Sequence, residues 1–156
     1  MTDRKLIISY KEYAFDELSG EDRQLVEAAV VAMRNAYSPY SNFKVGAAVR
    51  LSDGSIVIGS NQENAAYPSG LCAERTAMFA ASAQHPDLAI RSLAVAGGLN
   101  GQLEDVPASP CGACRQVMAQ YQRKAGAPLS VLVVGAEKVW KFDRVDDLLP
   151  FIFDSI

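Results

Sequence analysis

The chain has 156 residues, of which 49% are hydrophobic and 21% are charged, a composition that excludes a disordered chain. The net charge of -3 and the sequence pI of about 5.1 argue against binding to nucleic-acid phosphates. The apolar run Leu6–Ile8 is too short for a signal peptide, and no run could span a bilayer, so we expect a cytoplasmic protein without membrane contact. We expect a single domain over residues 1–156, with an N-terminal extension at about residues 1–18.

The first regular elements are predicted to be a helix and a hairpin. Apolar residues recur at helical spacing from about Ser19 to Ala36, and Ser19 is suited to cap that helix. The extended runs Phe43–Leu51 and Ser55–Ser60 flank Asp53 and Gly54, a dipeptide typical of a tight turn, so they predict a β-hairpin.

The rest of the chain is predicted to alternate between helices and strands. We expect buried helices over Cys72–Ala83 and Cys111–Gln122, strands over Ile90–Ala96, Leu129–Val134 and Val139–Phe142, loops over 61–70 and 97–110, and a last helical turn at Val145–Leu149. This alternation indicates an α/β sandwich built on a mixed sheet.

The three cysteines, Cys72, Cys111 and Cys114, lie at the predicted starts of two helices, where free backbone N–H groups and the helix dipole stabilise a thiolate. The three-residue spacing of Cys111 and Cys114 puts both sulfurs on one face of a first helical turn, which suits zinc. A third thiolate from the other helix leaves one position of a tetrahedral zinc open, as in catalytic sites. The single histidine, His85, follows the helix end about 17 Å from Cys72, so we do not expect it to close the site.

Three charged residues accompany the cysteines. Glu74, two residues after Cys72, can reach a water on the metal and carry protons, although a carboxylate at a helix start also simply complements the dipole. Arg75 lies three residues after Cys72 and Arg115 directly follows Cys114. A guanidinium that donates to a thiolate would withdraw charge from the metal centre. Both arginines are also compatible with ordinary surface charges.

These motifs resemble the tetrameric, three-cysteine type of the cytidine deaminase family. The similarity runs from about Ala36 to Phe153 and includes Tyr40–Ala48, Asn61–Pro68 and both cysteine motifs. It implies a three-layer α/β/α sandwich around a mixed five-stranded sheet. It also implies zinc-dependent hydrolytic deamination of cytidine and deoxycytidine to uridine and deoxyuridine, in pyrimidine salvage, by a homotetramer in which neighbouring chains complete each pocket.

The resemblance assigns the metal and catalytic residues. Cys72, Cys111 and Cys114 match the ligands of one Zn²⁺ per chain. Glu74 matches the proton shuttle that zinc deaminases are known to use, which takes a proton from the activated water and delivers it to the pyrimidine N3 and then to the leaving amine.

The resemblance also assigns residues that bind the nucleoside. Asn61 and Glu63 match the pair that holds the ribose 3′-hydroxyl, and Phe43 matches an aromatic residue beside the base. Tyr67 and Phe153 match residues that contribute across subunit interfaces. Taken without the resemblance, all five are better explained as turn, solvated or packing residues.

The chain departs from the family pattern at three places. A segment around Ile7–Asp16 is added, the loop Gly97–Ser109 is longer, and Gln62 replaces a common aliphatic residue. Three other functions remain open: deamination of another cytosine-containing nucleoside or nucleotide, thiol oxidoreduction by the pair Cys111 and Cys114, and a zinc-stabilised binding module, which would need a fourth protein ligand.

Overall fold

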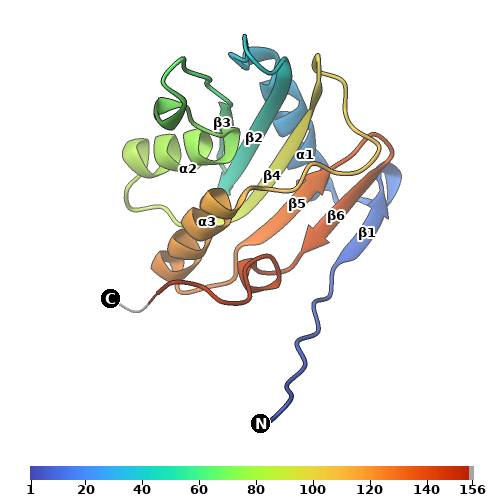
Figure 1. The fold of residues 1–156 in the computed structure, drawn as a ribbon, viewed down its shortest axis with the longest axis vertical. Helices are drawn as coiled ribbons and strands as arrows, with labels where there is room; N and C mark the ends of the chain where they lie inside the picture. The colour runs from blue at the N-terminus through green and yellow to red at the C-terminus, as the bar shows by residue number, and fades with distance from the viewer. Residues whose placement is uncertain (155–156) are drawn as a thin grey trace.

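A mixed sheet of six strands forms the centre of the structure, a computed structural model that describes residues 1–154 (Figure 1). The strands are β1 (Lys11–Ala14), β2 (Phe43–Leu51), β3 (Ile56–Ser60), β4 (Ile90–Leu99), β5 (Ser130–Val134) and β6 (Lys138–Phe142). The helices are α1 (Gly20–Ala32), α2 (Ala73–Gln84) and α3 (Gly112–Ala125), and short 3-10 turns lie at Phe15–Glu17, Met33–Asn35, Tyr67–Ser69 and Val145–Asp147. None of the helices in this described part has the length and apolarity that crossing a membrane requires.

The strand order in the sheet is β1-β6-β5-β4-β2-β3. All neighbouring pairs are antiparallel except β4 and β5, which run parallel. A parallel pair needs a crossover connection, and α3 provides it. The loop after β4 returns along the sheet, so the start of α3, with two of the cysteines, lies over β4 near Val95.

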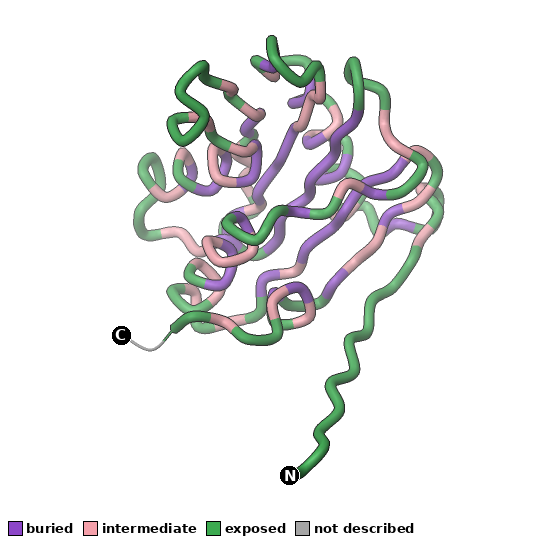
Figure 2. Tube along the Cα trace, viewed as in Figure 1, coloured by how far each residue is buried: buried purple, intermediate pink, exposed green. Residues whose placement is uncertain are grey.

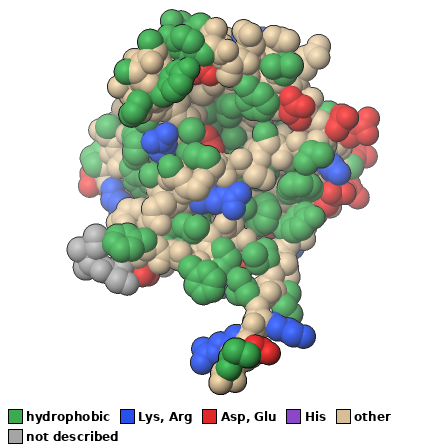
Figure 3. Space-filling view, in the orientation of Figure 1, with side chains coloured by type: hydrophobic (Ala, Val, Ile, Leu, Met, Phe, Trp, Pro, Cys, Tyr) green, Lys and Arg blue, Asp and Glu red, His purple; other side chains and the backbone are tan. Residues whose placement is uncertain are grey.

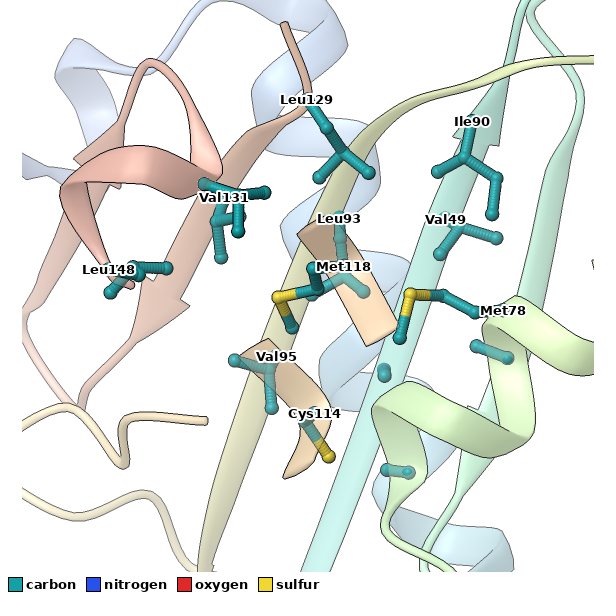
Figure 4. Close-up of a cluster of buried hydrophobic side chains, with 14 of the residues drawn as sticks. Val49, Met78, Ile90, Leu93, Val95, Cys114, Met118, Leu129, Val131 and Leu148 are labelled. Carbon is teal, nitrogen blue, oxygen red and sulfur yellow. The ribbon is translucent and has the colours of Figure 1, made fainter. Parts of the chain in front are cut away.

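The helices cover both faces of the sheet. Helix α1 packs on one face over β2 and β4, while α2 and α3 pack on the other face (Figures 1 and 2). Buried apolar residues form a separate cluster on each side of the strands. In the cluster under α2 and α3, Cys114 and Met118 of α3 lie beside Val95 of β4, and Met78 of α2 lies near Val49 of β2 (Figure 4). The predicted α/β/α sandwich is confirmed.

Two glycines allow helices to approach the sheet closely. A Cβ atom on Gly46 of β2 would lie 2.1 Å from the carbonyl oxygen of Ala29 in α1. A Cβ atom on Gly59 of β3 would lie 2.4 Å from the backbone nitrogen of Ala77 in α2. Both distances are far below van der Waals contact, so the missing side chains set how deeply each helix sits.

The sheet has one strand more than predicted, because part of the N-terminal extension pairs with the β6 edge. Lys11 forms an ion pair with Asp143 at 2.8 Å, and Trp140 Nε1 donates to Glu12 at 2.8 Å. The Tyr10 ring packs 5.4 Å from the Trp140 ring. The sequence did not predict this strand, because four residues are too few to show a strand periodicity and their partners lie some 130 positions later. Before this strand the chain forms an exposed tail with basic side chains near its end (Figure 3).

Strand β4 also runs further than predicted. The sequence predicts a loop from residue 97 on, but Gly97 and Gly98 stay paired with β2, and the strand ends at Leu99. A Cβ atom on Gly98 would lie 1.5 Å from the carbonyl oxygen of Gln102, so this glycine allows the next turn to fold back on the strand.

Candidate active site

Helices α2 and α3 begin side by side, and each begins at a cysteine. Cys72 is the N-cap of α2 and Cys111 is the N-cap of α3, both with extended backbone. Cys114 lies in the first turn of α3. The Cys72 Sγ lies 3.8 Å from the Cys111 Sγ, which lies 3.5 Å from the Cys114 Sγ. The fold thus joins three sulfurs from two segments about 40 residues apart.

The three sulfurs have the spacing of a zinc site. They lie within 4.8 Å of one another, while tetrahedral zinc with Zn–S bonds of about 2.3 Å separates its sulfurs by about 3.8 Å. Cys114 is buried, Cys72 is half-buried and Cys111 is exposed, so one side of the cluster is open. His85 is the C-cap at the opposite end of α2, away from the sulfurs.

Arg75 lies against this cluster. Its Nη2 is 3.7 Å from the Cys72 sulfur, while its buried Nε has no hydrogen-bond partner among the described residues. A hydrogen bond with Cys114, together with the Arg75 guanidinium, lowers the pKa of the Cys72 thiol to about 5. The same interaction with Cys72, together with burial, raises the pKa of Cys114. Of these two thiols, Cys72 is therefore the more acidic one.

Arg115 has partners different from those expected. Its Nε donates to the carbonyl oxygen of Pro110 at 2.7 Å, and its Nη1 donates to that of Leu148 at 2.9 Å. The expected contact with a thiolate is replaced by contacts with two carbonyl oxygens. The sequence shows only that Arg115 follows a cysteine, whereas the position of residue 148 depends on the fold. Arg115 thus holds the loop before α3 against the C-terminal segment.

Glu74 lies in the first turn of α2 with only 4% of its surface exposed. Burial, with a further contribution from the negative charge on Cys72, raises the pKa of its carboxyl group. A carboxyl group shifted in this direction accepts and returns protons closer to neutral pH than an ordinary one does.

A cavity of about 690 Å³ opens over the exposed side of the sulfur cluster. Its walls include Cys72, Cys111, Glu74 and Arg75, together with four of the residues expected to bind a nucleoside: Phe43, Asn61, Glu63 and Tyr67. The cavity therefore joins a metal-ligand cluster to an apolar ring, an amide and a carboxylate.

Phe153 lies elsewhere. It borders a different hollow beside α3 and is 66% exposed. The side-chain amide of Gln116 holds its backbone, donating to the carbonyl oxygen at 2.8 Å and accepting from the N–H at 3.3 Å. Within its own chain Phe153 takes no part in the cavity.

Asn61 is tied to β2 by both ends of its amide. Its Nδ2 donates to the carbonyl oxygen of Phe43 at 2.9 Å, and its Oδ1 accepts from the N–H of Val45 at 2.8 Å. An amide nitrogen carries two protons, so one N–H is left for another acceptor. Asn61 therefore fixes the cavity wall and retains one donor.

Two further residues of the wall, Tyr40 and Ser41, were given no role from the sequence. Tyr40 packs edge-on against Tyr67, with ring centroids 6.4 Å apart. Ser41 donates a hydrogen bond to Glu63, whose pKa is lowered mainly by this hydroxyl. Both lie in the segment Tyr40–Ala48 that carries the resemblance, but nothing in the sequence indicates their contact with residues 22 or more positions later.

Known proteins are similar to this chain in sequence and in fold. A family model described as the cytidine and deoxycytidylate deaminase zinc-binding region matches residues 19–126. A cytidine deaminase of Halalkalibacterium halodurans is 46% identical over 100 residues, covering 64% of this chain and 71% of that protein. A probable cytidine deaminase of Dictyostelium discoideum is 36% identical over 135 residues, covering 86% of this chain and 85% of that protein. The crystal structure of a cytidine deaminase from Burkholderia pseudomallei superposes with a TM-score of 0.68 at 42% identity, covering 83% of this chain and 97% of that one.

Proposed function

The chain belongs to the cytidine deaminase family, and from this we propose that it hydrolyses cytidine and deoxycytidine to uridine and deoxyuridine, releasing ammonia. The observation that carries the proposal is a cluster of three sulfurs, two of which line a single cavity together with a buried glutamate. An isolated redox pair would need neither Cys72 nor Glu74. A structural zinc site would be closed by a fourth ligand rather than open to a cavity.

We propose that Cys72, Cys111 and Cys114 hold one zinc ion per chain. When bound, zinc supplies the Lewis acidity that makes water a nucleophile near neutral pH. The Arg75 guanidinium, which lies against the Cys72 sulfur, offsets part of the negative charge of three thiolates. Its buried Nε, which has no hydrogen-bond partner in the part of the chain that the structure describes, is a further donor beside the cluster.

Glu74 is proposed to move the protons of the reaction. Its carboxylate accepts a proton from the water that attacks C4 of the pyrimidine and passes it to N3. The carboxylate then takes the second proton from the hydroxyl now on C4 and transfers it to the leaving amine, so that the C–N bond breaks, ammonia departs and the C4 carbonyl forms, a role known for the glutamate of zinc deaminases. Burial supports this role because it raises the pKa of Glu74 towards the working pH.

The remaining wall residues are proposed to bind the nucleoside. Phe43 offers a ring for contact with the base, and Val95 adds an apolar surface beside it. Asn61, through its free N–H, and Glu63, as an acceptor, are proposed to hold the ribose 3′-hydroxyl. A carboxylate at this point would also repel the phosphate of a nucleotide, which favours a free nucleoside.

The assembly is proposed to be a homotetramer, with Tyr67 and Phe153 reaching towards neighbouring pockets. Their exposures of 80% and 66% support this, because large apolar side chains on a surface are suited to subunit contacts. Size-exclusion chromatography with light scattering gives the mass directly. The three free cysteines support action in the reducing cytoplasm.

The test is an ultraviolet assay of cytidine loss, with zinc measured on the same sample. We expect one zinc per chain in the wild type. Glu74→Gln should keep zinc and fold but lower kcat by about 10²- to 10⁴-fold, the scale of general acid–base catalysis. Glu27→Gln, on the exposed side of α1, is the matched control and should match the wild type.

Each competing function predicts a different result. Retained activity in Glu74→Gln would refute the proton-transfer role. A preference for deoxycytidine monophosphate over both nucleosides would show that the substrate is a nucleotide and not a free nucleoside. A metal-free protein with a reversible disulfide would indicate an oxidoreductase, and a zinc protein without deamination would indicate a binding module.

A further inference from the structure

The Glu63 carboxylate is bound by the turn that precedes β2, at Tyr40 and Ser41. Its Oε2 accepts from the N–H of Tyr40 at 2.9 Å and from the N–H of Ser41 at 3.3 Å. Its Oε1 accepts from the Ser41 hydroxyl. The backbones of the two segments are also joined, since the Glu63 N–H donates to the carbonyl oxygen of Tyr37 at 2.8 Å. Three donors therefore converge on one carboxylate.

Ser41 is itself held in place by the turn. Its hydroxyl oxygen accepts from the N–H of Phe43 at 3.0 Å, so its single proton is directed at Glu63. Between them, Asn42 has a left-handed backbone with φ of 56°, and its N–H donates to the carbonyl oxygen of Ser38 at 3.0 Å. The hydroxyl therefore points at the carboxylate because the turn leaves it no other direction.

We infer that Ser41 is a positioning residue for substrate recognition, which orients Glu63 so that its remaining acceptor position faces the ribose 3′-hydroxyl. This inference rests on the role proposed above for Glu63. A carboxylate has about four acceptor positions, and the turn occupies three of them. Ser41, Phe43, Asn61 and Glu63 line the same cavity, so the remaining position opens to the ligand.

Loss of the hydroxyl should weaken binding and leave the chemistry unchanged. In Ser41→Ala the carboxylate keeps two backbone donors on Oε2 but loses the bond that fixes Oε1, so it turns and hydrates more freely. The sulfur cluster and Glu74 belong to α2 and α3, which Ser41 does not support. The change should therefore appear in KM and not in kcat.

The experiment compares cytidine with 3′-deoxycytidine, which lacks the hydroxyl in question. We expect Ser41→Ala to raise KM for cytidine about tenfold, the scale of a hydrogen bond to a charged group. With 3′-deoxycytidine, wild type and variant should agree within about twofold, because the group that Glu63 would hold is missing. Ser41→Thr keeps the hydroxyl and should restore most of the affinity for cytidine.

Ser55→Ala is the matched control. The Ser55 hydroxyl donates to Asp53 at 2.6 Å in the turn between β2 and β3, at the far end of β2 from the cavity. It removes the same kind of serine–carboxylate bond and should leave both KM values unchanged. Zinc content and thermal unfolding of each variant show that the fold is retained.

Three outcomes would overturn the inference. A rise in KM of equal size for both nucleosides would show a general structural effect, and an unchanged KM for cytidine would show no effect. If wild type itself handles both nucleosides equally, Glu63 does not hold the 3′-hydroxyl, and the inference falls with that assignment. Failure of deamination as such is separate, since it would appear as no turnover of cytidine by the wild type.

Discussion

Gly59→Ala tests whether the packing of α2 on β3 sets the geometry of the active site. Gly59 lies under the first turns of α2, the helix that carries Glu74 and begins at Cys72. An added Cβ would lie 2.4 Å from the nitrogen of Ala77 and 2.8 Å from the carbonyl oxygen of Ala73. Both are backbone atoms, so no side chain can rotate to relieve the overlap.

The expected displacement of α2, and its effect on rate and stability, follow from those distances. Ordinary contact begins at 3.4 Å, so the start of α2 must move by about 1 Å relative to β3. A misplacement of about 1 Å in a catalytic group costs on the order of 10²-fold in rate. Overpacking of this kind also costs about 1–3 kcal/mol of stability, which lowers Tm by several degrees for a chain of this length.

The assay is kcat for cytidine, measured with zinc content and Tm on the same preparation. Gly20→Ala is the matched control, because nothing lies within 4 Å of its added Cβ and its backbone angles suit any residue. We expect Gly59→Ala to lose about 10²-fold in kcat and to bind zinc more weakly, with the control unchanged. Full activity and full zinc content in Gly59→Ala would refute the argument that this contact positions α2.

Two further predictions address the metal ligands and the N-terminal strand. Cys114→Ser should lose zinc and activity together, because it removes the buried one of the three sulfurs. Zinc analysis and the cytidine assay on the same sample check this, and a variant that keeps full zinc and activity would contradict it. Deletion of residues 1–14 should uncover Trp140, the only tryptophan, shift its fluorescence to longer wavelength and lower Tm, since β1 and Tyr10 cover the β6 edge. Its kcat should not change, because none of the residues that line the cavity belongs to residues 1–14. An unshifted emission or a lost kcat would show that the extension does something else.

The sequence predicted most of the fold because its signals are local. The helical periodicity after Ser19 and the turn at Asp53 and Gly54 depend on neighbouring residues only. The same holds for the pair Cys111 and Cys114, whose spacing is that of one helical turn. The helices and strands predicted in this way begin and end within a few residues of those in the structure.

The sequence also determined the chemistry, through the residue types at the two helix starts. Three cysteines, a neighbouring glutamate and no suitably placed histidine indicate an open thiolate metal site before any coordinates are known. What local spacing does not contain is the distance between the two helix starts. That distance follows from the crossover between β4 and β5 and from α2 lying against Gly59.

Only the tertiary structure decided the contacts between residues distant in the chain. In the structure Arg115 donates to the carbonyl oxygen of Leu148 and not to a sulfur, and β1 pairs with β6. It also brought the Ser41 hydroxyl to Glu63, 22 positions later. The physical reason is the same in each case: a hydrogen bond across a long loop forms only after the packing of the core has closed that loop, so no nearby residue signals it.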